Sequence, residues 1–142
     1  MSVRILLISH GELAAAAAGS ARMIVGDSFL VETIMLGEEE GIEKFRTQLQ
    51  AYYMENKDSE ILTVCDIPNG SPYITACLES KKILKEGNYA VIAGMNLGML
   101  LEILTSSPDR TLEEMKKAAL EAGTDAVMEY QSLAAEDMEE EL

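Results

Sequence analysis

The chain has 142 residues but only one histidine and two cysteines, and it lacks any apolar run close to the roughly 20 residues needed to span a membrane. So few ligands, without paired spacing, argue against a zinc site. Because His10 and Glu12 interrupt the first apolar stretch too early for a signal peptide, we expect a cytoplasmic protein with free thiols.

Basic residues are also scarce, with 11 against 25 acidic residues and a net charge of −14. Nucleic acid and anionic membrane are therefore excluded as main partners, since both require a basic surface. Part of the negative charge is concentrated in residues 132–142, which we interpret as a solvated acidic tail after a single domain at 1–131. The remaining charge suits a basic protein partner, because opposite charges accelerate encounter.

What the sequence does contain is a regular alternation of apolar runs and helical patterns. The run "VRILLIS" at 3–9 is typical of a strand buried on both faces. Further strands are predicted at 29–35, 60–66, 89–94 and, shorter, 126–131. This pattern predicts an α/β fold with a doubly wound, mainly parallel sheet in the flavodoxin-like order 2-1-3-4.

Helices are predicted between these strands. An alanine-rich helix over 12–25 is expected to end at Gly26, and a capping box begins a later helix at Thr111, which Gly123 is expected to end. The other helices are predicted at 42–55, at 73–86 and from "MNLGML" to a point before Pro108.

The unusual residues follow the carboxyl ends of the strands. In such sheets, the ligand crevice lies beyond these ends, where the strand order reverses. The four ends are His10-Gly11, the acidic loop that begins at Gly37, the turn at 66–72, and residues 94–98. We expect these four segments to meet at one edge of the sheet and to form the site.

His10 is the central candidate, as a general base, a nucleophile or a metal ligand. Gly11 would let a ligand approach the backbone, and the next helix would direct its positive end there, which suits phosphate. If the first and third strands are neighbours, Asp66 lies beside His10. Its carboxylate could then fix the tautomer and leave Nε2 as a nucleophile, although Asp66 could instead be an N-cap or turn residue.

Three residues of the "NGSP" turn, Asn69, Gly70 and Ser71, could hold a phosphoryl group through backbone N–H groups and a hydroxyl. Ser71 could also simply cap the following helix, with Pro72 at its first position. Asn96 could orient the same group. We predict no metal-binding residues.

Two enzyme classes are considered and set aside. The sequence "SHGE" resembles the start of histidine phosphatases, but that family requires an arginine before the histidine and a second histidine, and neither is present. A nucleotide-binding module is poorly supported, because the glycine-containing loops match neither a P-loop nor G-x-G-x-x-G.

Taken together, "SHGELA", "CDIPNGSP" and "GMNLGMLLE" resemble the enzyme IIA component of the mannose family of the bacterial phosphoenolpyruvate-dependent sugar phosphotransferase system. The resemblance covers residues 3 to about 131. It implies that His10 accepts a phosphoryl group from the phosphocarrier protein HPr and passes it to enzyme IIB. Asp66 would hold the imidazole, and the Ser71 region would contact the phosphoryl group.

The resemblance further implies a homodimer that exchanges an antiparallel final strand, at most peripheral association with a membrane permease complex, and no metal or organic cofactor. The chain departs from the family pattern at Asn69, where glycine is common, and at Gly98, where proline is common. Asparagine tolerates left-handed backbone angles, so the first change is compatible with the loop. An alternative is a regulatory module that phosphorylation of His10 would switch.

Overall fold

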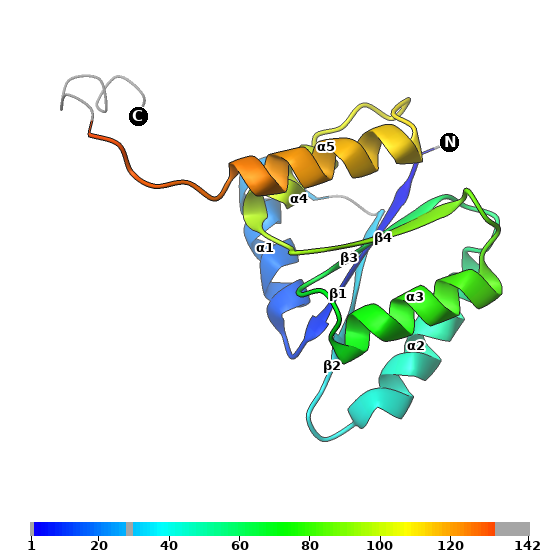
Figure 1. Ribbon diagram of the computed structural model, residues 1–142. Coiled ribbons are helices and arrows are strands. Elements are labelled where there is room, and N and C mark those ends of the chain that lie inside the picture. Colours follow the sequence, from blue (N-terminus) through cyan, green and yellow to red (C-terminus); the bar gives the residue numbers. More distant parts are fainter. Residues whose placement is uncertain (1, 28–29, 133–142) are drawn as a thin grey trace.

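The fold is a four-stranded parallel sheet in the order β2-β1-β3-β4, as predicted, with helices on both faces (Figure 1). The computed structural model describes residues 2–27 and 30–132. The elements in chain order are β1 (Arg4–His10), α1 (Leu13–Val25), β2 (Val31–Leu36), α2 (Gly41–Glu55), β3 (Ile61–Cys65), α3 (Ser71–Ile83), β4 (Tyr89–Ala93), α4 (Leu97–Leu104) and α5 (Leu112–Asp125). No helix among these residues is long and apolar enough to cross a membrane.

Two apolar layers enclose the sheet. On one face, Ile5 and Leu7 of β1 pack against α1, α4 and α5. On the other face, Leu6 and Ile8 pack against α2 and α3. Because successive strand residues point to opposite faces, the continuous apolar run of β1 reflects burial on both sides.

The position of β1 determines where the site lies. It pairs in parallel with β2, in a register that sets His10 beside Leu36, and with β3, in a register that sets Ile8 beside Cys65. The chain therefore passes from β1 to β2 on one side and then crosses over to β3 on the other side of β1. The strand order reverses at the β1–β3 boundary, which is where a ligand crevice is expected.

Several predicted helix ends are confirmed, although the helix expected at 73–86 is α3, Ser71–Ile83. Gly26 ends α1 with a φ of 85°, and Thr111 and Glu114 form the capping box of α5. The prediction that Gly123 ends α5 is wrong, because this helix continues to Asp125. A Cβ on Gly123 would lie 2.7 Å from Met99 Cε, so this glycine provides room for the contact between α4 and α5.

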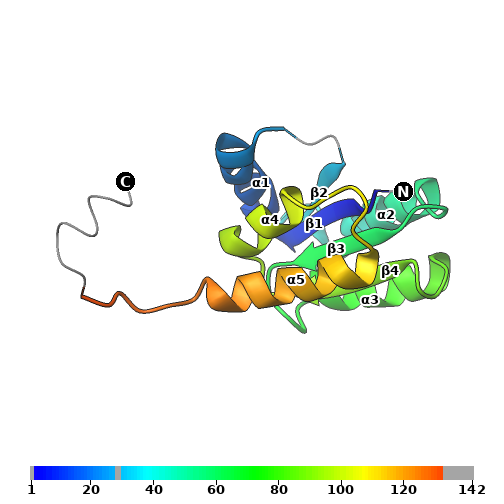
Figure 2. The same cartoon turned by 90° about the horizontal axis from the view of Figure 1, so that it is seen from above.

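Residues 126–131 do not form the predicted strand in the single chain. Ala126 caps α5, and the chain then leads away from the body of the protein in both views (Figures 1 and 2). A strand needs a neighbour to bond its backbone, and within residues 2–132 no strand lies beside this segment. Exchange between two chains stays a prediction, and residues 133–142 of the predicted acidic tail lie outside the described residues.

Candidate functional site

The structure brings together His10, the last residue of β1, and Asp66, the residue after β3. Asp66 Oδ2 lies 2.8 Å from His10 Nδ1 and also accepts the backbone N–H of His10 at 2.9 Å. The expected pairing at the reversal of strand order is therefore present. One carboxylate oxygen fixes both the main chain and the ring of the same residue.

This geometry determines the tautomer of His10. An ionised carboxylate only accepts hydrogen bonds, so Nδ1 carries a proton and the lone pair of the neutral ring is on Nε2. The His10 side chain is 46% exposed, whereas that of Asp66 is 7% exposed. The ring therefore presents a nucleophilic nitrogen to solvent from a buried anchor.

Hydrogen bonds hold Asp66 in its charged form. Burial alone would raise the pKa of this carboxyl, but bonds from His10, from the Ile67 N–H and from the Cys65 thiol together lower it below its ordinary value of 3.8. Oδ1 accepts the Ile67 N–H at 2.8 Å and the thiol at 3.3 Å. Asp66 is consequently an anion at neutral pH.

Ser9 shapes the turn that carries the histidine, a role that the sequence analysis missed. Its buried hydroxyl donates to the Gly11 carbonyl at 2.9 Å and accepts the Ala14 N–H at 2.8 Å. Gly11 adopts a φ of 56°, which glycine takes without strain. Ser9 thus bonds an N–H group at the start of α1. A hydroxyl residue shortly before a predicted helix is the signal that could have revealed this role.

The turn before α3 approaches the exposed side of the ring. A Cβ on Gly70 would lie 2.8 Å from His10 Cε1 and 3.4 Å from Nε2, so only glycine fits there. Asn69 adopts the left-handed conformation, with a φ of 65°. The positive end of α3 therefore lies beside Nε2, where it suits an anion.

Ser71 is the first residue of α3, and Pro72 is the second. Gly70 is the N-cap, so the alternative interpretation of Ser71 as the cap is wrong. Ser71 is exposed, and its hydroxyl has no hydrogen-bond partner within the described residues. It remains available to a bound group.

Asn96 has a different role from the one expected. Its side chain accepts the Met99 N–H at 3.0 Å, which caps α4, and donates to the Gly123 carbonyl of α5 at 3.0 Å. The structure therefore directs Asn96 toward the α4–α5 contact and does not bring it to His10.

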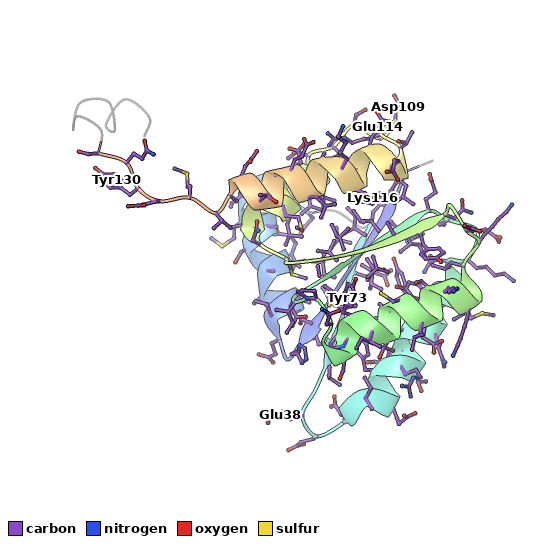
Figure 3. All side chains as sticks on the ribbon, viewed as in Figure 1. Glu38, Tyr73, Asp109, Glu114, Lys116 and Tyr130 are labelled. Carbon is purple, nitrogen blue, oxygen red and sulfur yellow. The ribbon has the colours of Figure 1, made fainter. Side chains whose placement is uncertain are left out.

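An open cleft of about 640 Å³ lies beside His10 on the side of β2. It is lined by His10, Gly11, Leu36 and four residues of the β2–α2 loop and of the start of α2, namely Gly37, Glu38, Gly41 and Ile42. Figure 3 shows Glu38 at the outer end of this loop. The sequence placed the loop at this edge but gave its residues no role.

The polar groups of the site do not form a metal centre. Among residues 2–27 and 30–132, no three His, Cys, Asp or Glu side chains come close enough together to hold an ion. The chemistry that the arrangement offers is that of an oriented, exposed imidazole next to a helix N-terminus.

Known proteins share this arrangement of sequence and fold. The model of the EIIA-man family, described as the PTS system fructose IIA component, matches residues 4–120. The mannose-specific EIIAB component of Escherichia coli K12 is 31% identical over an alignment of 132 residues, which covers 89% of this chain but only 39% of that protein. The sorbose-specific EIIA component of Lacticaseibacillus casei is 25% identical over 80% of each chain.

A solved structure agrees with these relatives. The mannose/sorbose-specific IIA subunit from Enterococcus faecalis superposes with a TM-score of 0.84 at 26% identity, covering 94% of this chain and 98% of that one. The family model covers most of the chain, and the fold agrees over almost its full length. The chain therefore belongs to the mannose family of enzyme IIA components of the sugar phosphotransferase system.

Proposed function

We propose that this protein is a phosphoryl carrier in which His10 accepts a phosphoryl group from phosphorylated HPr and transfers it to an enzyme IIB component. The observation that supports this most is the orientation of the imidazole. Asp66 holds Nδ1 at 2.8 Å, and Nε2 is left free on a half-exposed ring. This is the form in which an imidazole acts as a nucleophile.

In the proposed step, the Nε2 lone pair forms a bond to phosphorus while the phosphorus–nitrogen bond of the donor breaks and its electron pair returns to the donor ring. The His10 ring gains positive charge as the new bond forms. Asp66 stabilises this charge through the Nδ1–H bond. Transfer to enzyme IIB repeats the displacement with His10 as the leaving group, so the chain returns to its starting form.

The phosphoryl oxygens would be held mainly by the turn before α3, where Gly70 approaches Nε2 and is flanked by Asn69 and by the Ser71 hydroxyl at the positive end of the helix. Gly11 would contribute space and not a donor, because its N–H already donates to the Leu36 carbonyl at 2.8 Å. Phosphoryl transfer requires mainly positioning and charge stabilisation, which such groups supply. Asn96 is not part of this set, because its side chain holds α4 and α5.

The surface around His10 has features that suit the binding of protein partners. Exposed apolar side chains at Leu13, Ile67 and Ile74 follow β1 and β3 or lie in the first turn of α3. Acidic residues 38–40 on the β2–α2 loop suit a partner that presents basic residues at its binding surface. The name of the E. coli relative joins the IIA and IIB components, which supports enzyme IIB as the acceptor.

The same proposal includes a cytoplasmic homodimer that associates with a membrane permease complex only peripherally. Strand β4 is at the edge of the sheet, and Val127 and Met128 are about four-fifths exposed, at 80% and 78%. An antiparallel strand from a partner, formed by its residues 126–131, would pair with β4 and cover such side chains. Sedimentation velocity would test the dimer.

The decisive experiment is incubation of the protein with phosphorylated HPr. We expect one acid-labile phosphate per chain, which disappears in His10→Ala, while circular dichroism shows an unchanged fold. Failure of the folded wild-type protein to label would refute the proposal. Chase with enzyme IIB then distinguishes a relay, which loses its label, from a regulatory module, which keeps it.

A further inference from the structure

The carboxylate of Asp66 has one hydrogen bond that the proposed mechanism does not use. A carboxylate offers about four lone-pair positions. His10 occupies two of them at Oδ2, through its backbone and its ring, and the Ile67 N–H occupies one at Oδ1. The fourth donor is the thiol of Cys65, 3.3 Å from Oδ1.

Cys65 is well suited to act as a donor. It is fully buried at the end of β3 and packs in the apolar layer between the sheet and α2 and α3. Burial raises the pKa of this thiol to about 12, and its hydrogen bond to Asp66 and the charge of Asp66 act in the same direction. The sulfur therefore keeps its proton at neutral pH.

The thiol proton has two possible acceptors. Besides Asp66 Oδ1 at 3.3 Å, the carbonyl of Ile67 lies 3.6 Å from the sulfur. The carboxylate is closer and carries a charge, and hydrogen bonds to ionised acceptors are the stronger ones. The proton is therefore directed to Asp66.

We propose that Cys65 is a positioning residue for phosphoryl acceptance, because its S–H bond completes the set of donors that holds Asp66 against the His10 ring. Without this bond, one lone pair of a buried carboxylate has no donor, and Asp66 can rotate away from Nδ1. The inference rests on the proposed function, since the effect is on the reactivity of His10 Nε2. It assigns a chemical role to a residue whose position alone indicates only apolar packing.

The kinetic test compares two small substitutions of Cys65, one that removes the hydrogen-bond donor and one that keeps it. In Cys65→Ala, which removes the donor, we expect labelling by phosphorylated HPr to be about fivefold slower at saturating donor, with an unchanged KM. In Cys65→Ser, which keeps a donor, most of the lost rate should return. The matched control is Cys77→Ala, which removes the half-buried thiol of α3 and should label like the wild type.

Equal loss in the alanine and serine variants would show that Cys65 only fills space, and wild-type labelling in Cys65→Ala would show that the bond has no effect. Either result overturns the inference while leaving the proposed function intact. A wild-type protein that fails to label overturns the proposed function instead.

A second measurement requires no activity. In the Cys77→Ala background, Cys65 supplies the only S–H infrared stretching band. Replacing Asp66 by asparagine should move this band to higher frequency, because a neutral oxygen is a weaker acceptor. An unmoved band would overturn the hydrogen bond on which the inference depends, even if the alanine variant folds poorly.

Discussion

The turns that follow β3 and β4 lie at the same edge of the sheet, and each contains a polar residue that the sequence suggested for the site. Asp66, after β3, directs its carboxylate to His10 at 2.8 Å. Asn96, after β4, directs its amide to Gly123 of α5 and caps α4. One turn therefore prepares a reactive group, while the other joins two helices.

The difference shows that a polar residue at the carboxyl end of a strand is not by itself a site residue. Its hydrogen-bond partners decide its role. Asp66 neighbours β1, where the strand order reverses, whereas Asn96 follows the edge strand and faces the helices that cover it. Variants of the two turns should therefore separate reactivity from stability.

The largest effect is expected for Asp66→Asn. Asparagine can donate to Nδ1 and thus favour the wrong tautomer, so labelling by phosphorylated HPr should fall roughly 100-fold. Rapid-quench measurement of the label would give the rate, and urea unfolding would confirm that the fold is retained. A rate within threefold of the wild type would remove Asp66 from its proposed role.

A smaller loss is expected for Gly70→Ala. The new Cβ would lie 2.8 Å from His10 Cε1, so the ring must move, and labelling should slow about tenfold. The control is Gly19→Ala within α1, where the nearest atom to the new Cβ would be Arg22 Nη2 at 3.9 Å. That change should raise stability by about 0.5–1 kcal/mol and leave labelling unchanged; equal rates in both variants would contradict the close approach.

For Asn96→Ala, we expect the opposite pattern. Loss of the α4 cap and of the bond to Gly123 should lower the free energy of unfolding by about 1–2 kcal/mol, with labelling within twofold of the wild type. Thr111→Ala, which removes the cap of α5, is the matched control for stability. A large loss of labelling in the folded variant would return Asn96 to the phosphoryl-binding set.

The smallest effect concerns pH. Asp66 has a lower pKa in the folded chain than its ordinary value of 3.8, so its ionised form stabilises the fold above about pH 4, and this contribution is lost as pH falls through the folded-state pKa. The difference in unfolding free energy between wild type and Asp66→Asn should therefore narrow in acid. A difference that stays constant as the pH falls would contradict the lowered pKa of Asp66.

The sequence was sufficient to predict the sheet and the pairing of His10 with Asp66. Both depend on strand periodicity and on a common strand order, which are local or general features. It placed Gly70 in the site but could not predict its close approach to the His10 ring, because that contact joins two separate turns. Nor could it predict the direction of Asn96, because a residue before a helix can either cap it or face a ligand.

The structure of residues 126–131 could not be predicted from the sequence for a related reason. Its composition suits a strand, but a strand exists only with a neighbour, and Tyr130 lies on a segment that leads away from the body of the chain (Figure 3). The β-strand preference of a segment can suggest a strand, but it does not show which neighbouring strand would pair with it.

The bond between Asp66 and the backbone of His10 has a consequence for folding. It requires β1 and β3 to pair in the register that sets Ile8 beside Cys65. A slip of two residues would keep each side chain on its proper face yet move Asp66 by roughly 6–7 Å. A misaligned sheet could thus remain apolar inside and still lack a working histidine, so the rate of phosphate uptake would report the fidelity of strand alignment.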